Sequence, residues 1–427
     1  MRIVYAYDAP LPHTGADAEQ VVNTVAAMAR RGAAIELFIP GFPESARNAA
    51  PLREYFHVEG DFRLGHVSPP PRVRLLEKWG FARRVARDPR LAAADLCYTR
   101  NLPTAWSLLR AGRRVVYEHF RPWGDQVPPL QPVLRGILRH PGLVGAVFHS
   151  RHTLESYRRL GIPEPRMLVA HNGWDPARME PRLSRDEARR AVDLAPGRFT
   201  ALYSGRINAR KGLDIILAAA RLAPEIAFVL VGSEGEGQVE AEARQLANVR
   251  VVPWQPFRSL APWLYAADVL VVPPSLEPLT RHGNTVLPIK LFLYLAAARP
   301  LLAPRAPDTA ELLTDGVNAV LVPPGDVEAT VAALRALATE PARAESLAAG
   351  ARATASDLTW DARAGHILDF LTARLAAPPD SLPSGPWSTA GWLRECAGWV
   401  LGRRPQPIGP AKPSNRRAAE PPSPRAV

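Results

Sequence analysis

The sequence has almost no cysteine, since Cys97 and Cys396 are its only two among 427 residues. They lie far apart and show none of the short spacings of metal-binding cysteines, so neither a disulfide framework nor a zinc site is supported. Scarce cysteine without a disulfide pattern is typical of a reducing compartment. We therefore expect a cytoplasmic protein.

Long apolar runs are also lacking. None approaches the roughly 18 residues that a bilayer-spanning helix needs, so we expect a soluble or peripherally attached protein. The first residues enter directly into a strand-like run from Arg2 to Tyr7. No charged region, long apolar core or cleavage site precedes that run, which predicts that there is no signal peptide.

Acidic residues are too few to balance the basic ones. The chain has 53 Lys and Arg against 41 Asp and Glu, a formal charge of +12. Such an excess suggests an anionic partner, such as a phosphorylated ligand, an anionic membrane surface or nucleic acid. The basic residues are scattered and nearly all arginine, which argues against nucleic acid and makes compositional bias a second explanation.

What the sequence does contain is a regular alternation of apolar strand-like runs with amphipathic helical segments. This alternation predicts parallel sheets with helices on both faces, so the fold class is α/β. The length suits two such doubly wound domains in series. The expected strands are Ile3 to Tyr7, Ile35 to Ile39, Leu96 to Thr99, Val115 to Glu118, Ala146 to His149, Phe199 to Tyr203, Ala227 to Val231, Val249 to Val252, Val269 to Val272, Pro300 to Ala303 and Ala319 to Val322.

Three stretches interrupt this alternation of strand-like and helical segments. Residues 41 to 72 are rich in Gly, Pro and charge, and we expect an irregular insertion or a mobile loop there. The charged, proline-marked stretch from 176 to 196 indicates a domain linker. Residues 378 to 427 are rich in Pro and Arg and should be largely disordered. Within them, Trp387 to Leu401 combines tryptophan with arginine, which suits weak membrane or partner docking or a short helix packed on the protein's own surface.

A strand, a basic loop and a helix follow one another just past the middle of the chain. The loop holds Gly205, Arg206, Lys211 and Gly212. Backbone N–H groups and the helix dipole favour anions at this end of a strand-loop-helix unit. The pattern therefore indicates a phosphate-binding loop, although a surface turn with solvated cations fits the loop alone equally well.

Other candidate site residues also follow strands. Gly15 precedes the first helix, in a loop where backbone could approach a ligand or that is an ordinary tight turn. Glu118 with His119 ends a strand on the side of the ligand crevice, and a structural histidine is the alternative. Lys290 lies in the first turn of an apolar helix, where a cation opposes the helix dipole and costs up to about 1 kcal/mol unless an anion is near. A solvated lysine is the alternative. Gly232 begins a glycine-rich loop whose spacing is not that of a dinucleotide fingerprint, which argues against nicotinamide binding.

Taken together, several short stretches over roughly residues 1 to 376 resemble the retaining glycosyltransferases of family 4, which have the GT-B fold of two Rossmann-like domains facing a cleft. The stretches are Tyr203-Ser-Gly205-Arg206 with Lys211-Gly212, Val231-Gly232, Ala267-Asp268-Val269 with Pro273-Pro-Ser275, Pro288-Ile-Lys290-Leu-Phe-Leu-Tyr294-Leu-Ala296, Asp315-Gly316 with Val322-Pro-Pro324, and Thr359-Trp360.

The resemblance implies a division of the chain. Residues 1–178 would form the acceptor domain, 179–358 the nucleotide-sugar domain, 359–377 a helix crossing back to the first domain, and 378–427 the tail. It implies a nucleoside-diphosphate sugar as donor and a saccharide or glycolipid as acceptor. Neither a cofactor nor a metal is expected, and the sequence contains no Asp-x-Asp triplet.

The resemblance also assigns roles to residues. Arg206 and Lys211 match the pair that neutralises the donor diphosphate, and His119 matches a histidine that contacts the transferred sugar; these three are the expected catalytic residues. Arg100 and Glu118 would line the cleft. The expected donor-binding residues are Gly15, Gly205, Arg206, Lys211, Gly232, Thr285 and Lys290.

One departure from the family concerns the donor ribose. The family commonly carries two glutamates eight positions apart, and the second is thought to hold the ribose hydroxyls. Here these positions hold Thr285 and Leu293. A leucine cannot accept hydrogen bonds, and each lost charged hydrogen bond is worth about 1.5 to 3 kcal/mol.

The leading hypothesis is a retaining glycosyltransferase of polysaccharide or glycolipid biosynthesis. A sugar-nucleotide epimerase, which shares this architecture, is an alternative that needs no acceptor. A non-catalytic binding protein derived from a transferase is another, and Leu293 favours it.

Overall fold

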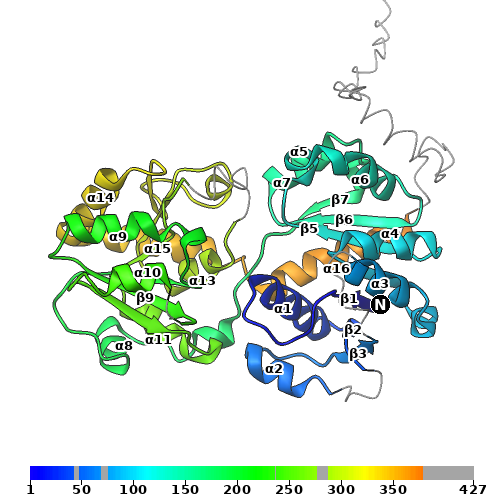
Figure 1. Cartoon of the computed structure of the whole chain (residues 1–427), viewed down its shortest axis with the longest axis horizontal. Coiled ribbons are helices and arrows are strands. Elements are labelled where there is room, and N and C mark those ends of the chain that lie inside the picture. The colour runs from blue at the N-terminus through cyan, green and yellow to red at the C-terminus, as the bar shows by residue number, and fades with distance from the viewer. Residues whose placement is uncertain (43–47, 69–75, 236, 277–286, 378–427) are drawn as a thin grey trace, which may run out of the picture.

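The computed structural model describes residues 1–42, 48–68, 76–235, 237–276 and 287–377, which form two α/β domains side by side (Figure 1). The first domain has a seven-stranded sheet of order β3-β2-β1-β4-β5-β6-β7, in which all pairs are parallel. Its strands are β1 Arg2–Ala6, β2 Ala34–Pro40, β3 Arg63–Val67, β4 Leu96–Thr99, β5 Val115–His119, β6 Leu143–Phe148 and β7 Met167–Val169.

The second domain repeats this plan. Its six parallel strands have the order β10-β9-β8-β11-β12-β13. The strands are β8 Thr200–Ser204, β9 Ala227–Ser233, β10 Val249–Pro253, β11 Val269–Val271, β12 Leu301–Pro304 and β13 Val320–Val322. The predicted α/β class with two parallel sheets is thus confirmed, and the strands follow the apolar runs closely because parallel strands buried on both faces need continuous apolar sequence.

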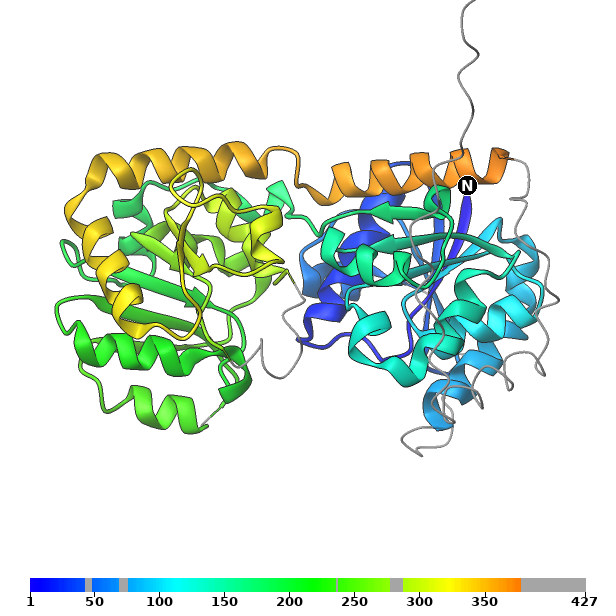
Figure 2. The ribbon, with the colours of Figure 1, turned by 90° about the horizontal axis from the view of Figure 1, so that it is seen from above.

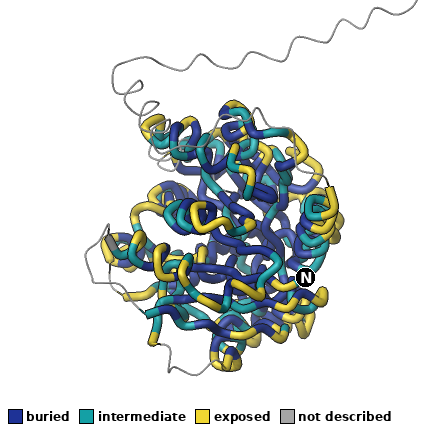
Figure 3. Tube along the Cα trace, turned by 90° about the vertical axis from the view of Figure 1, so that its right-hand side faces the viewer, coloured by how far each residue is buried: buried dark blue, intermediate teal, exposed yellow. Residues whose placement is uncertain are grey.

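Helices cover the sheets. In the first domain they are α1 Ala16–Arg30, α2 Ala50–Phe56, α3 Leu76–Ala86, α4 Leu102–Arg110, α5 Trp123–Gln126, α6 Gln131–Leu138 and α7 Arg151–Arg158. In the second they are α8 Arg185–Ala191, α9 Leu213–Leu222, α10 Gln238–Ala243, α11 Ala261–Ala266, α13 Lys290–Ala297, α14 Val327–Thr339 and α15 Pro341–Ala355, and α16 Trp360–Ala376 follows. The strands are mostly buried, and exposed residues gather on the outer turns (Figure 3).

The prediction of an irregular stretch from 41 to 72 is wrong for the residues of it that the structure describes. This part of the chain contains α2 and β3, and β3 pairs with β2 at the edge of the sheet. An edge strand has only one neighbour, so its sequence Arg-Leu-Gly-His-Val has few of the apolar residues that mark a central strand.

The stretch from 176 to 196 is more than a linker. It holds α8, which begins with a capping box between Ser184 and Glu187 and packs against α11 of the second domain. This helix was not predicted because its sequence, Arg-Asp-Glu-Ala-Arg-Arg-Ala, is mostly charged and shows no apolar period.

The chain crosses between the domains twice, and the two crossings pair with each other. Trp174 and Thr359 form a parallel bridge, in which the Trp174 N–H donates to the carbonyl oxygen of Leu358 at 3.0 Å. A Cβ added at Gly173 would lie 2.5 Å from the Trp360 nitrogen. Only glycine therefore permits this close approach of the two crossings.

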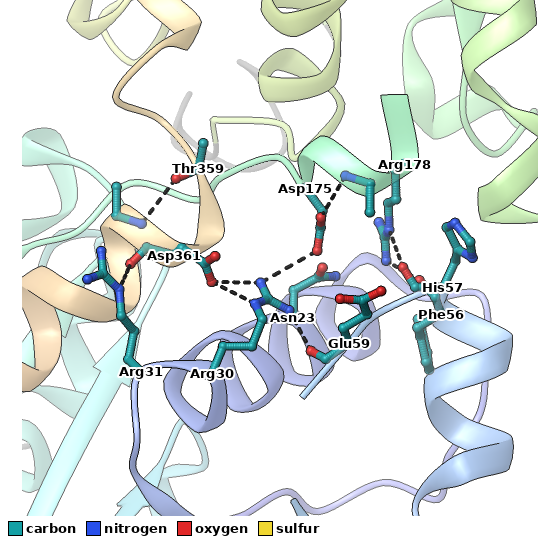
Figure 4. A network of polar contacts seen from close by, with 12 residues as sticks. Asn23, Arg30, Arg31, Phe56, His57, Glu59, Asp175, Arg178, Thr359 and Asp361 are labelled. Atoms are coloured by element: carbon teal, nitrogen blue, oxygen red, sulfur yellow. Dashed lines mark hydrogen bonds and ion pairs between the residues drawn. The ribbon is translucent and has the colours of Figure 1, made fainter. Parts of the chain in front are cut away.

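Charged side chains of α1 and of its C-cap residue Arg31 contact both crossings (Figure 4). Arg30 pairs with Asp361 at 2.7 Å and with Asp175 at 3.5 Å, and the Arg31 guanidinium donates to the carbonyl oxygen of Asp361 at 3.2 Å. Arg178, beyond the first crossing, forms a buried ion pair with Glu19 at 2.6 Å. The relative position of the domains thus depends on contacts with α1.

The last described helix, α16, lies along the first domain although it follows the second in sequence (Figure 2). It packs against α1 and β6, and Trp360, Ile367 and Leu371 belong to the core of the first domain. In the described part of the chain, no helix combines the length and apolar character required to cross a membrane. The Trp387 to Leu401 segment and the rest of the tail lie outside the described residues.

Candidate anion site between the two domains

The two sheets bring their topological switch points to the same place. The strand order reverses between β1 and β4 in the first domain and between β8 and β11 in the second. Ligands of open α/β sheets bind in the crevice outside the strand ends at such a point. Residues that follow β1, β4 and β8 are therefore the first candidates for a site.

Direct contacts join these loops across the domain boundary. Thr14, after β1, donates its hydroxyl to Glu234 Oε1 at 2.6 Å. Arg206, after β8, hydrogen-bonds the Thr14 hydroxyl and lies 3.3 Å from Glu234 Oε1 through its Nε. Gly15 follows Thr14, begins α1 as its N-cap, and donates its N–H to His13 Nδ1 at 3.0 Å. The loops holding Gly15 and Arg206 thus face each other.

Three glycines let the loops of the second domain pack tightly. Gly205, Gly212 and Gly232 have φ of 134°, 71° and 123°, which residues with side chains rarely adopt. A Cβ on Gly232 would lie 2.4 Å from the carbonyl oxygen of Gly205, and one on Gly205 would lie 2.6 Å from Lys290 Nζ. The Lys290 ammonium therefore lies directly against the backbone of the basic loop.

We expect Gly232→Ala to lower the free energy of unfolding by about 1–3 kcal/mol, because alanine would be strained at this φ and would clash with Gly205. Chemical denaturation would measure the loss. Gly316→Ala is a matched control, since Gly316 has a φ of 75° but a Cβ added there would meet no atom within 4 Å. An equal loss in both variants would show that the contact with Gly205 contributes nothing.

Three cations gather at this loop. Lys290 Nζ lies 3.6 Å from the centroid of the Tyr203 ring, and burial, followed by repulsion from Lys211, holds the pKa of Lys290 well below its usual value. Burial and the Arg206 charge also lower the pKa of Lys211. Among the residues with described placement, no carboxylate pairs with either ammonium. The arrangement is electrostatically unfavourable until an anion joins it.

Two helices begin at the same place. Gly212 is the N-cap of α9, and α13 starts at Lys290. The positive ends of both helix dipoles add to the charge of the three side chains. An anion with two charged groups, such as a diphosphate, would satisfy both lysines.

His119 ends β5, and the contacts of its side chain with Arg121, Trp123 and Tyr157 lie within the first domain. Its side chain is 1% exposed, and burial lowers its pKa to about 3, so the ring is neutral near pH 7. Its Nδ1 lies 2.8 Å from the carbonyl oxygen of Arg121, which can only accept, and 2.8 Å from the Tyr157 hydroxyl, which can donate or accept, so the contacts of Nδ1 fit either neutral tautomer. The Trp123 ring lies 4.2 Å away, centroid to centroid. With the proton on Nδ1, the neutral ring can accept a hydrogen bond from a hydroxyl at Nε2.

Glu118 does not line the cleft, contrary to the expectation. It is 0% exposed and is held by His149, by Gln20 and Arg363 at 2.6 Å each, and by the Tyr5 hydroxyl at 3.3 Å. Burial alone would raise its pKa, but Arg363 and His149 hold the pKa well below its usual value. Successive side chains of a strand point to opposite faces, so Glu118 faces away from where His119 faces.

The remaining predicted residues are distributed as follows. Arg100, after β4, hydrogen-bonds the Gln20 side chain and lies over the Phe120 ring. Leu293 is 9% exposed and packs in the core of the second domain. Thr285 lies outside the described residues.

Residues that were not among the predicted site residues also contribute contacts at the domain boundary and at the basic loop. Thr14 and Glu234 form a hydrogen bond between the domains, and the Lys290 ammonium lies over the Tyr203 ring. The Glu311 carboxylate of the second domain accepts hydrogen bonds at 2.7 Å from the Arg151 and His152 N–H groups that begin α7. Thr14 and Glu234 adjoin glycine-containing loops that the sequence marks, but no local pattern shows that the loops meet.

Two Rossmann-like domains that face each other across a basic site define the GT-B class of proteins. Family models agree: residues 18–178 match Glycosyltransferase Family 4, and residues 198–340 match Glycosyl transferases group 1. The chain belongs to the glycosyltransferases of family 4.

Curated relatives include D-inositol 3-phosphate glycosyltransferases. That of Thermomonospora curvata is 31% identical over 268 residues, covering 57% of this chain and 60% of the relative. That of Catenulispora acidiphila is 29% identical over 226 residues, covering 49% and 52%. The chain thus spans about half to three fifths of the length of the curated relatives it matches.

Solved structures share the fold. Sucrose-phosphate synthase from Thermosynechococcus elongatus has a TM-score of 0.71 and 17% identity, covering 88% of this chain and all of that one. Anabaena HepE, solved in complex with UDP-glucose, has a TM-score of 0.65 and 19% identity, covering 87% of this chain and all of that one. At these identities the likeness concerns the fold alone.

Proposed function

We propose that the protein is a retaining glycosyltransferase that moves a sugar from a nucleoside-diphosphate sugar to an acceptor hydroxyl, in polysaccharide or glycolipid biosynthesis. The observation that carries this proposal is the gathering of Arg206, Lys211 and Lys290 at the start of two helices, with no carboxylate pairing either lysine among the described residues. The names of the curated relatives and the UDP-glucose bound to HepE support it.

The site suits the charge that transfer creates. When the bond between the sugar and the diphosphate breaks, its electron pair moves onto the departing phosphate. Fixed cations in a site that excludes water stabilise this developing charge without reorganising. Arg206 would leave Glu234 for the donor phosphate, and neutral His119 would accept a hydrogen bond from a hydroxyl of the transferred sugar.

A thermal-shift panel with UDP, GDP, ADP and their sugars tests the donor site. Bound ligand at 100 times its Kd should stabilise the wild type by about 2.7 kcal/mol. The double variant Arg206→Ala/Lys211→Ala should lose most of this effect. If no nucleotide stabilises the wild type, or if the variant responds equally, the donor-site assignment is wrong.

Product analysis separates the alternatives once a donor is known. A transferase releases nucleoside diphosphate only as the acceptor is glycosylated, whereas an epimerase converts the donor sugar without any acceptor. Binding without either product would identify a non-catalytic protein, the outcome that Leu293 in the apolar core favours.

Donor binding should take up protons at alkaline pH. Burial and Lys211 lower the pKa of Lys290 in the free protein, and a bound diphosphate would raise it. Between the two pKa values, free Lys290 is neutral and bound Lys290 is charged, so affinity should fall as pH rises through this window. Calorimetry of the nucleotide in Tris and in HEPES would measure the uptake, and Lys290→Met should reduce it to the share of Lys211, whose pKa is also lowered in the free protein. Equal heats in both buffers at every alkaline pH would contradict the prediction.

A further inference from the structure

One carboxylate lies among the cations of the candidate anion site. Arg206 Nε lies 3.3 Å from Glu234 Oε1, and the Arg206 guanidinium also hydrogen-bonds the Thr14 hydroxyl. Thr14 in turn donates that hydroxyl to Glu234 Oε1 at 2.6 Å. Lys211 and Lys290 pair with no carboxylate among the described residues. Glu234 thus places a negative charge on the one cation of the three that would otherwise be open to a phosphate from the side of the first domain.

The Glu234 side chain can leave Arg206 without a change in its own loop. The two side chains are 43% and 41% exposed, so water can replace each partner when the pair separates. The loop itself is held by another carboxylate, that of the buried Glu240. It accepts hydrogen bonds from the Ser233 hydroxyl at 2.8 Å and from the Gly237 N–H at 3.2 Å, on either side of Glu234.

Aromatic contacts next to this ion pair also join the domains. Tyr55 of α2 stacks on Trp254, which follows β10, with ring centroids 6.1 Å apart, and the Phe56 and Phe257 rings lie 5.6 Å apart by the same measure. Burial, followed by the Glu234 charge, raises the pKa of Tyr55, which places these rings near the carboxylate. The domains therefore stay in contact beside the site when the Glu234 carboxylate moves.

We propose that Glu234 competes with the donor diphosphate for Arg206: it pairs with Arg206 in the free protein and again after the nucleotide leaves. Glu234 thereby sets the affinity of the donor site, a role that rests on the proposed function. When only a fraction of the protein is competent to bind, the apparent Kd rises by the inverse of that fraction. Glu234 therefore weakens the binding of the donor and of the nucleoside-diphosphate product alike.

Calorimetry of the full chain tests this role with two ligands: inorganic pyrophosphate, and the nucleotide that the thermal-shift panel identifies, or UDP if none does. Glu234→Gln keeps the side-chain length and removes the charge, so it should tighten the binding of both by about two- to fivefold, the range for an exposed ion pair. Glu242→Gln is the matched control. Glu242 pairs with Arg221 at the same 3.3 Å between similarly exposed side chains, and its loss should leave the affinity unchanged.

Two further variants separate competition for Arg206 from simple repulsion of the ligand by Glu234. In an Arg206→Ala background, Glu234→Gln should no longer tighten binding, because there is no guanidinium left to compete for. Glu234→Asp keeps the charge but is one methylene group too short for the contact, so it should tighten binding even if the Arg206→Ala protein binds too weakly to measure. The proposal is overturned if the gain persists without Arg206, or if Glu234→Asp binds like wild type while Glu234→Gln gains.

The donor-site assignment and the role of Glu234 fail separately. If the nucleotide binds through Arg206 and Lys211 but Glu234→Gln changes neither affinity, the donor site stands and the competition by Glu234 is disproved. If no nucleotide binds, yet pyrophosphate binds Glu234→Gln more tightly than wild type, Glu234 competes for Arg206 in a site that is not a nucleotide site. If neither ligand binds wild type or Glu234→Gln, both proposals are wrong.

Discussion

Lys290→Met is expected to lower the rate of sugar transfer by about 10²- to 10³-fold while leaving the fold at least as stable as wild type. Removing one fixed donor aimed at a developing negative charge has a cost of this size in other enzymes. Stability should not fall, because Lys290 is a desolvated cation without a carboxylate partner among the described residues, and methionine fills a similar volume against Tyr203. Transition-state stabilisation and stability therefore oppose each other at this residue.

Steady-state kinetics and chemical denaturation of the same preparations would measure both effects. Lys78→Met is the matched control, since Lys78 is exposed and pairs with Asp8 at 3.2 Å. That variant should change neither rate nor stability appreciably. A Lys290→Met enzyme that is less stable yet fully active would show that the lysine serves the fold and not the reaction.

The elements of both domains could be predicted largely from the sequence because their strands are buried on both faces. Such strands are continuous apolar runs, and β4, from Leu96 to Thr99, has the predicted bounds. The edge strand β3 and the charged helix α8 were not predicted, for the converse reason. β3 and α8 each pack mainly against one neighbouring element, so few of their residues need to be apolar and their sequences show no clear hydrophobic pattern.

The candidate site was less predictable because it is made by two domains. Each strand end marks nearby residues such as Arg206, but the contact of Arg206 with Thr14 joins positions 192 residues apart. Strand ends also do not show which face a side chain occupies. Glu118 and His119 are neighbours in sequence, yet the carboxylate of Glu118 forms a closed network with Arg363 and His149.

The second large expected effect concerns stability, and it arises from the hydrogen bonds and ion pairs of Glu118. Arg363→Met is expected to lower the free energy of unfolding by about 3–5 kcal/mol, because it leaves the Glu118 carboxylate buried without its main counter-charge. The Arg363 and Glu118 side chains are 2% and 0% exposed, and their atoms lie 2.6 Å apart. Arg363 also donates to the Thr24 hydroxyl of α1 at 3.0 Å, so one side chain of α16 contacts both β5 and α1.

Chemical denaturation would measure the loss, with Arg352→Met, an exposed arginine of α15, as the matched control. The cost should arise from the unpaired charge and not from the missing contacts alone, so the double variant Glu118→Gln/Arg363→Met should recover part of it. Additive losses in the double variant would contradict that origin. Because β5 carries His119 next to Glu118, recovery of stability should also restore the position of the ring, and with it the rate of transfer.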